Sequence, residues 1–392
     1  MTSGVPDNGA EAGFPGAIGL RTYLHTRAMR PWVSRHLGPA VTWLREEHGF
    51  FLQSLRRGWL HGSHLDLLVH DAEGRELPIG PVVERLRGGC RDVDVVTVDE
   101  ESYLRNAERL GALEGVAGPY LPLHPHGTIE TLTADRIRGW DQEAERLRSS
   151  ALARMTGALL ATAGADSEST LLHHLVGAFA AVAGTHPAGI EYGCISFRSH
   201  VESFLHWNGQ GGRIRAALEQ RLEAERTSID AAVAAALSGE SDAVATRWTA
   251  AAHYVTGLFD AAVATGVLDY HGVQRLAGTD PAAPRIESVF ESESFRRPST
   301  LSEFHQEAEA TGVTSDPGAW FTTYRVLVNL FYQQLPVLDV SPLTRLYLCL
   351  AVSESVDRLT GRSWRDRLEP LKADYQARDL NADQRPARSA AP

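Results

Sequence analysis

The chain has 392 residues, 43% of them hydrophobic and 8% aromatic, which allows two or three domains with a sizeable buried core. Its formal net charge of −11 argues against nucleic acid as a partner, because binders of a phosphate backbone need net or clustered positive charge. No apolar run approaches the roughly 20 residues that cross a bilayer, so no membrane partner is expected either.

The two ends of the chain carry few residues that could be buried. We expect residues 1–16 to be disordered and residues 375–392 to form a mobile tail. The N-terminus shows no basic segment ahead of an apolar core, so a cytoplasmic protein without a secretory signal is predicted. Cys90, Cys194 and Cys349 form no C-x-x-C pair, which favours reduced structural thiols over a disulfide framework or a zinc site.

Residues 17–126 alternate between strand and helix patterns. Residues 19–26 read as a strand and 33–47 as a helix, and 48–71 read as two strands around a bend. A short helix over 81–89 and a strand over 92–99 follow. The β-α-β-β-α-β order predicts a ferredoxin-like α/β part.

Residues 127–374 lose the strand pattern and show successive amphipathic helices, which predicts a helical lobe and an α+β fold overall. The helices are expected over residues 133–163, 167–184, 200–207, 212–238, 242–266, 299–311, 318–335 and 342–360.

The chain contains none of the motifs GxxxxGK[ST], HExxH and GxSxG, nor a GxGxxG after a strand, which removes most support for nucleotide binding, zinc proteolysis and serine hydrolysis. His61 with His64 and His124 with His126 have metal-like spacings. No carboxylate or cysteine stands at a supporting distance, so we expect these histidines to face solvent or substrate, and no metal.

A polar cluster within GIEYGCISFRSHVESFLHW, residues 189–207, admits two interpretations. Ser199 and Glu202 have the S-x-x-E spacing of a capping box at a helix start. The same stretch, with Arg198 and His200, could instead be the floor of an active site.

Two later helices raise the same question. Ser341, followed by a proline, is typical of an N-cap, and Tyr347, Glu354 and Arg358 then fall on one face of the helix. A carboxylate on that face should pair with an arginine or bind a ligand. The aromatic stripe that includes Tyr324 is typical of a helix in the core, although a pocket wall is the alternative.

Three segments together resemble a known family. FFLQSLRRGWLHGSHLDLLV (50–69), GCISFRSHVESFL (193–205) and RLYLCLAVSESVDRLTG (345–361) resemble, in order, the glutamate-elimination domains of lanthipeptide dehydratases, a family that also contains stand-alone thiopeptide enzymes. The resemblance covers most of residues 17–370.

The departures from the family pattern are informative. Gln53, Asp66 and Leu68 stand where elimination domains usually carry arginines, and Ser353 or its neighbour stands where a histidine is expected. Removing a glutamate ester needs an acid/base pair and cationic help for the leaving carboxylate. The resemblance is therefore nearer to the pyridine synthases, which keep the scaffold and change the chemistry.

By resemblance, pyridine synthases act on a ribosomally made precursor peptide with a leader and a dehydrated core. They perform a formal four-plus-two aza-cycloaddition between two dehydroalanines, close a macrocycle, and then lose water and the leader as a carboxamide. Such chemistry needs mainly positioning, hydrogen-bond donors and a weak acid/base. It requires no cofactor, and other biosynthetic enzymes are possible partners.

The resemblance and the chemistry together give two sets of candidate site residues. The catalytic candidates are Arg198, Ser199, His200, Ser341, Tyr347 and Glu354. The substrate-binding candidates are Trp59, His61, His64, Tyr324 and Arg358.

Three other readings stay open at this point. The chain could be the elimination subunit of a split dehydratase, with Arg56 and Arg57 supplying the cations. It could be a non-catalytic scaffold that presents a leader peptide, for which an edge strand of the ferredoxin-like part is the natural place. It could also be an unrelated α+β protein.

Overall fold

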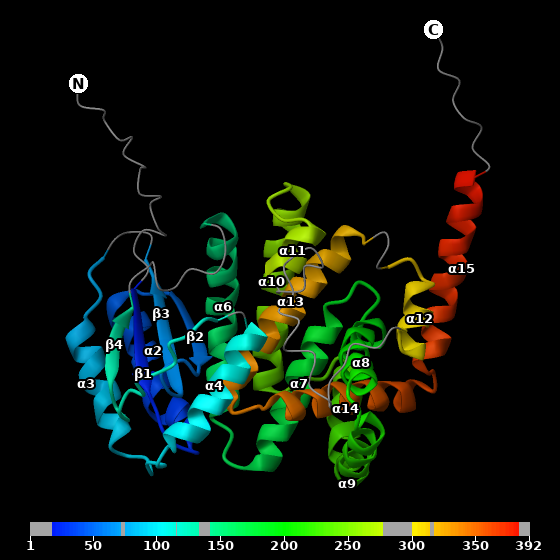
Figure 1. Ribbon diagram of the computed structural model, residues 1–392. Coiled ribbons are helices and arrows are strands. Elements are labelled where there is room, and N and C mark those ends of the chain that lie inside the picture. The colour runs from blue at the N-terminus through cyan, green and yellow to red at the C-terminus, as the bar shows by residue number, and fades with distance from the viewer. Residues whose placement is uncertain are drawn as a thin grey trace, which may run out of the picture.

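The computed structural model describes residues 18–71, 75–114, 116–132, 142–276, 300–313 and 317–383 of this α+β protein. A small sheet with its helices lies at one end of the molecule, and helices make up the rest (Figure 1). The expected disorder of residues 1–16 concerns a segment outside the described residues.

The sheet has four strands in the order β2-β3-β1-β4, and each neighbouring pair is antiparallel. The strands are β1 (Ile18–Tyr23), β2 (Leu52–Gly58), β3 (His64–His70) and β4 (Ile129–Leu132). The connecting helices are α1 (Met29–Trp32), the π-helix η1 (Val33–Leu37), α2 (Gly38–His48), α3 (Ile79–Cys90) and α4 (Glu100–Glu114). Chain order and strand order are those of a ferredoxin-like unit, which confirms the predicted fold class.

The register gives the sheet one apolar and one polar face. Leu20 lies opposite Leu67, which also faces Leu55, and all three are buried in the main hydrophobic core. The next residue on each strand points its side chain to the opposite face of the sheet. There Asp66 lies opposite both Arg21 and Arg56.

Asp66 is fully buried and pairs with both arginines. Arg21 Nε donates to its Oδ1 at 2.8 Å, and Arg56 Nη2 donates to its Oδ2 at 2.7 Å. Hydrogen bonds and charge from the arginines outweigh burial and hold the pKa of Asp66 below its usual value. The row of charges therefore crosses three strands as a structural network in which two arginines share one carboxylate.

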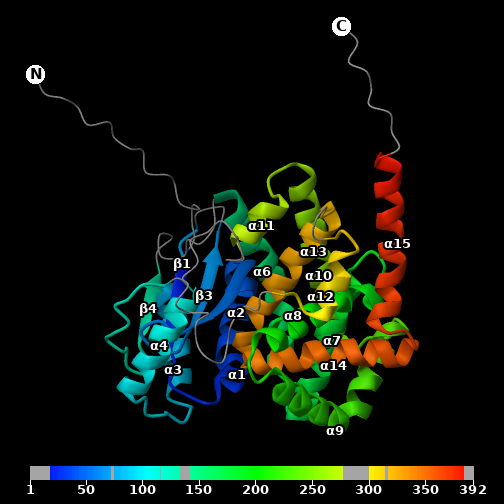
Figure 2. The same ribbon diagram turned by 45° about the vertical axis from the view of Figure 1, so that its right-hand side comes forward.

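The helical part follows β4. It consists of α6 (Gln142–Ala163), α7 (Glu168–Gly184), α8 (Ile190–Trp207), α9 (Gly211–Leu237), α10 (Ala243–Ala264), α11 (Tyr270–Leu276), α12 (Glu303–Glu309), α13 (Ala319–Gln334), the 3₁₀-helix η3 (Leu335–Leu338), α14 (Pro342–Thr360) and α15 (Trp364–Asp383). Helix α14 runs from the sheet side to the base of α15 at the opposite end of the molecule, as Figures 1 and 2 both show.

One hydrophobic core joins the two parts. The largest buried cluster contains Leu55 of the sheet together with Phe331 of α13 and Leu350 of α14. Helix α6 packs along strand β2, where the Thr156 hydroxyl donates to the Gln53 carbonyl at 2.9 Å. The sheet thus forms a rigid support for the helices that carry the candidate site residues. Whether residue 126 divides two domains stays a prediction.

Several predicted boundaries are corrected. Residues 92–99 form no strand, since Val95 and Val98 are exposed and helix α4 follows instead. The fourth strand is β4, which comes after residue 127 and not before it. Helix α15 continues through Asp383, beyond the start of the expected tail. The strand pattern of 92–99 misled because alternation does not show whether a partner strand is available.

The three cysteines are all buried and free. In the described part of the chain, no helix is long and apolar enough to span a bilayer.

Candidate active site

Helix α8 lies among α7, α9, α13 and α14 and carries three of the catalytic candidates. It begins at Ile190, with Gly189 as its N-cap at a φ of 76°, so Ser199 and Glu202 lie well inside the helix. The capping-box interpretation is therefore wrong. The apolar residues before Arg198 concealed the helix start, because a short apolar run fits a buried strand as well as a helix.

Arg198 and His200 point to different helices. Arg198 contacts α14 and His200 contacts α13. Residues two apart on a helix do not face the same way. The structure therefore separates two candidates that we expected to project into one cleft.

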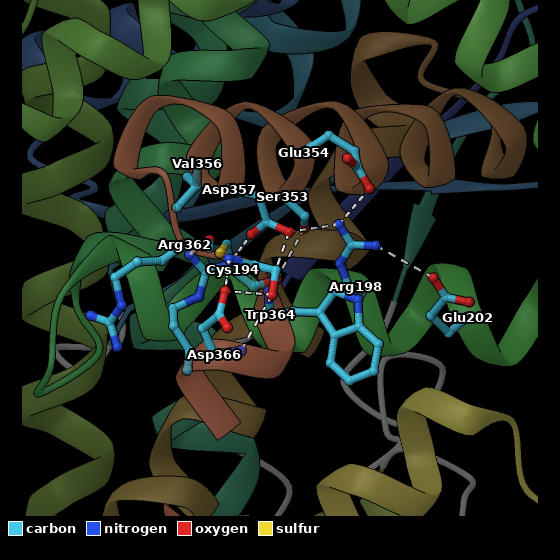
Figure 3. Close-up of polar contacts among 12 residues, drawn as sticks. Cys194, Arg198, Glu202, Ser353, Glu354, Val356, Asp357, Arg362, Trp364 and Asp366 are labelled. Carbon is cyan, nitrogen blue, oxygen red and sulfur yellow. Dashed lines mark hydrogen bonds and ion pairs between the residues drawn. The ribbon is translucent and has the colours of Figure 1, made fainter. Parts of the chain in front are cut away.

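Arg198 is the centre of an ion cluster between α8 and α14 (Figure 3). Its side chain is buried, and Nη2 donates to Glu354 Oε1 at 2.5 Å and to Asp357 Oδ2 at 3.2 Å. Glu202 on α8 is the third carboxylate, 3.5 Å from Nη1. The expectation that Glu354 pairs with an arginine is confirmed.

The other charges of this Arg198 cluster are compensated as well. Asp357 also accepts from Arg367, which is 1% exposed, and Glu202 accepts from Arg215 at 2.6 Å. Burying a charged side chain is costly unless a side chain of opposite charge pairs with it, as happens here. The cluster ties α8 to α14, α15 and α9.

A cleft of about 240 Å³ opens beside Arg198. Phe304 and Trp364 form aromatic walls, with their ring centres 5.0 Å apart, and Glu303 and Arg365 pair at the rim. The charged side chains that line the cleft are paired with carboxylates or arginines in the described structure.

Ser199 belongs to a histidine network next to this cleft. Its hydroxyl lies 3.0 Å from His305 Nε2, and the Ser203 hydroxyl lies 3.1 Å from the same atom. Ser302 contacts the other ring nitrogen, Nδ1, at 2.6 Å. Burial lowers the pKa of His305, so a neutral imidazole fastens α12 onto α8.

His200 belongs to a second polar group, made with Tyr332 of α13 and Cys349 of α14. His200 Nδ1 lies 3.0 Å from the Tyr332 hydroxyl, which lies 3.1 Å from Cys349 Sγ. Burial raises the pKa of Cys349 to about 12 and that of Tyr332 well above its usual value, so both keep their protons.

Both protons are available for hydrogen bonds to neighbouring atoms. Because nitrogen is the better acceptor, we assign the Tyr332 hydroxyl as the donor to His200 Nδ1 and the Cys349 thiol as the donor to Tyr332. This assignment places the proton of neutral His200 on Nε2. Burial, followed by the charges of Arg345 and Arg325, lowers the pKa of His200 to about 3, so the ring is neutral at physiological pH.

The remaining candidates on α14 have structural partners. Ser341 is the N-cap, as its local pattern predicts, and its hydroxyl accepts from the Thr344 amide at 3.1 Å. It lies about 20 Å along the axis from Glu354 at 1.5 Å per residue. Tyr347 donates to Glu225 Oε2 at 2.6 Å, and Arg358 binds Asp230. These last two contacts join α14 to α9.

The substrate-binding candidates lie in different places. Tyr324 is buried and donates to the Gly193 carbonyl at 2.9 Å, which agrees with the core interpretation. His64 is 2% exposed, with Nδ1 2.8 Å from the Gly62 carbonyl, so its side chain lies below the surface of the sheet part. Trp59 and His61 are half-buried, and the Trp59 ring packs against Tyr120.

Sequence reasoning missed Arg345 and His305 and treated Tyr332 as core. Arg345 lies over the Tyr332 ring, with its guanidinium carbon 4.8 Å from the ring centre. A signal was available for Arg345, because it is a charge inside the apolar stretch LTRLYLCLAV. His305 gave no local signal, since its partner Ser199 is 106 residues away.

Comparison with known proteins identifies the fold. The chain is similar to the solved structure described as "Pyridine synthase, TbtD, from thiomuracin biosynthesis", with a TM-score of 0.60 and 21% identity over 88% of this chain and 99% of that one. It is also similar to TsrL, with a TM-score of 0.58 and 13% identity over 91% and 98% of the two chains. Neither a family model nor a curated protein matches the sequence.

Proposed function

We propose that this protein is a thiopeptide-type biosynthetic enzyme that joins two dehydroalanines of a modified precursor peptide. The reaction is a formal four-plus-two aza-cycloaddition, which closes a macrocycle and releases the leader peptide. The similarity in fold to a protein described as a pyridine synthase supports this proposal at the level of the fold. The observation that carries the chemistry is the neutral His200–Tyr332 pair between α8 and α13.

The reaction requires neutral hydrogen-bond donors such as these. One peptide amide must become its iminol tautomer, so a proton leaves nitrogen and another arrives on the carbonyl oxygen. Two carbon–carbon bonds then form, the iminol carbon loses its hydroxyl as water, and the leader leaves as a carboxamide. A neutral donor such as His200 Nε2–H can hold the amide oxygen during the first step and assist the departing hydroxyl in the later one.

The contacts on β2 give less support to the elimination alternative. Arg56 is held by Asp66, which it shares with Arg21, and Arg57 donates to Asp339 Oδ1 at 2.5 Å and to the Pro336 carbonyl. Both arginines are already bound to carboxylates of the protein, which gives little support to a role in stabilising a leaving glutamate carboxylate.

Two side chains at positions where this chain departs from the elimination-domain pattern also have structural hydrogen bonds. Gln53 is buried and donates to the carbonyls of Val41 and Phe50. Ser353 is buried and donates to the carbonyls of Cys194 and Cys349. A hydroxyl satisfied by two carbonyls cannot replace the imidazole that the elimination domains carry there.

Mass spectrometry tests the proposal. The purified protein is mixed with a leader-bearing peptide that contains two dehydroalanines and, separately, with one that contains a glutamylated serine. We expect the first peptide to give a macrocycle lighter by the leader carboxamide and one water. Loss of glutamate from the second peptide would favour elimination, and binding without any change in mass would favour the scaffold reading.

Tyr332→Phe tests the residue that carries the proposal. Without its hydroxyl, His200 Nδ1 loses its donor and the proton is no longer held on Nε2, so we expect the cyclisation rate to fall by about 100-fold. Tyr192→Phe, on α8 with no hydrogen bond to its hydroxyl in the described structure, is the matched control. Equal rates for the two variants would remove the His200–Tyr332 pair from the mechanism.

A further inference from the structure

Arg345 differs from the buried arginines elsewhere in the structure. Arg21 binds Asp66, Arg198 binds Glu354, and Arg367 binds Asp357. Within the described part of the chain, by contrast, the half-buried Arg345 side chain contacts the Tyr332 ring and no carboxylate. Its Nε atom is buried without a hydrogen-bond partner there, as are those of Arg198 and Arg367, but those two arginines have carboxylates at their terminal nitrogens. Arg345 therefore keeps its terminal donors for an acceptor from outside the described structure, either water or a ligand.

The surroundings of Arg345 add a second donor. Arg345 lies over the face of Tyr332, and His200 bonds the hydroxyl of the same tyrosine. The His200 ring centre is 5.0 Å from that of Tyr332. In the described structure Nε2 of His200 has no partner, and the tautomer assigned above gives this atom a proton. Helices α8, α13 and α14 thus bring a guanidinium and an imidazole N–H to one side chain.

We propose that the Arg345 guanidinium and the His200 Nε2–H form a two-donor site for a carbonyl oxygen of the bound peptide. Two donors on one oxygen stabilise negative charge that develops there. Both groups act as hydrogen-bond donors, so the site polarises the carbonyl and stabilises charge on its oxygen while the donors keep their protons.

The assignment of the oxygen to a peptide amide rests on the proposed function. In that reaction the amide carbonyl becomes the iminol oxygen, and this oxygen later leaves as water. The donor pair would therefore act at the start and again at the loss of the hydroxyl. The existence of the donor site rests on the contacts of Arg345, His200 and Tyr332 and on the tautomer assigned to His200, and not on the reaction.

The first test uses acetate as a small carboxylate probe and does not depend on turnover. The protein is labelled with ¹⁵N-histidine, and the His200 signal is assigned by its loss in His200→Gln. Acetate should shift His200 Nε2 saturably in the wild type and in Arg154→Gln. Arg154 lies over the Tyr254 ring at 5.5 Å on the exposed surface, so its loss controls for a cation over a tyrosine.

In Arg345→Gln the saturable shift should disappear, and in Arg345→Lys it should persist with weaker affinity, because the charge remains but the planar fork is lost. Circular dichroism of each variant confirms that it is folded. An unchanged acetate shift in a folded Arg345→Gln variant overturns the inference.

Turnover of the dehydroalanine peptide forms the second test. Arg345→Gln should lower kcat by about 100-fold and change KM little, as expected when a donor to a developing oxyanion is removed. A wild type that binds acetate at His200 without cyclising the peptide would refute the proposed function and leave the donor site standing. A wild type that cyclises the peptide while Arg345→Gln matches it in rate and in acetate shift would do the reverse.

Discussion

The Arg198 cluster allows the stability effects of three substitutions to be ranked. Asp357→Asn removes a carboxylate shared by two buried arginines, Arg198 and Arg367. Arg198 still has Glu354. In the described structure Arg367, at 1% exposure, keeps only the Arg362 carbonyl as a hydrogen-bond acceptor, with Glu191 as a more distant negative charge. Breaking a buried pair so that one charge is left alone costs about 3–5 kcal/mol. We expect a loss in that range for Asp357→Asn.

Glu354→Gln should cost much less. The Glu354 side chain is 36% exposed, and Arg198 retains Asp357 when the charge on Glu354 is removed. We expect a loss of about 1 kcal/mol, near the value of a pair at the surface. Arg198→Met falls between the two, because Asp357 keeps Arg367 and Glu202 keeps Arg215. Its cost should be about 2–3 kcal/mol, for a lost charge-assisted hydrogen bond.

Urea unfolding followed by circular dichroism measures all three variants, provided that the m-value is unchanged. The decisive comparison is between Asp357→Asn and Glu354→Gln, which remove one charge each from the same turn of α14. If Glu354→Gln destabilises the protein as much as Asp357→Asn does, the argument from exposure and from the sharing of carboxylates is refuted.

Three further outcomes follow from single contacts. Ser341→Ala removes the N-cap of α14 and should cost about 1 kcal/mol, seen as a lower urea midpoint that Ser341→Asp does not show. Burial lowers the pKa of His64 to about 4 from 6.5, so the unfolded chain binds the proton first and stability falls as pH drops from 6.5 towards 4. His64→Gln should lose about 2–3 kcal/mol less than the wild type over that interval, and an equal loss would contradict the assignment. Gly193→Ala places a Cβ 2.1 Å from the Ala183 carbonyl oxygen where α8 meets α7, so it should lower the melting temperature, whereas Gly212→Ala, in open space, should not.

The sequence by itself determined the features that depend on neighbouring residues. Apolar periodicity predicted the helices over 167–184 and 342–360 to within a residue or so, because each buries one stripe whatever its partner is. The N-cap at Ser341 followed from Ser-Pro alone, since its acceptor role involves the amide three residues on. The first three strands and the helices between them indicated a ferredoxin-like topology, whereas the fourth strand was predicted over 92–99 and lies at Ile129–Leu132.

Only the tertiary structure decided which polar groups meet. Arg198 and His200 are two residues apart, yet the packing of α8 sends one to Glu354 and the other to Tyr332, which are 156 and 132 residues away respectively. Tyr347 and Arg358 share a face with Glu354 but are drawn to α9. Helical spacing states which side chains share a face, and it does not state which neighbour covers that face. For this reason the sequence could supply His200 as a candidate, whereas its partner Tyr332 and the Arg345 guanidinium over the Tyr332 ring emerged only from the packed helices.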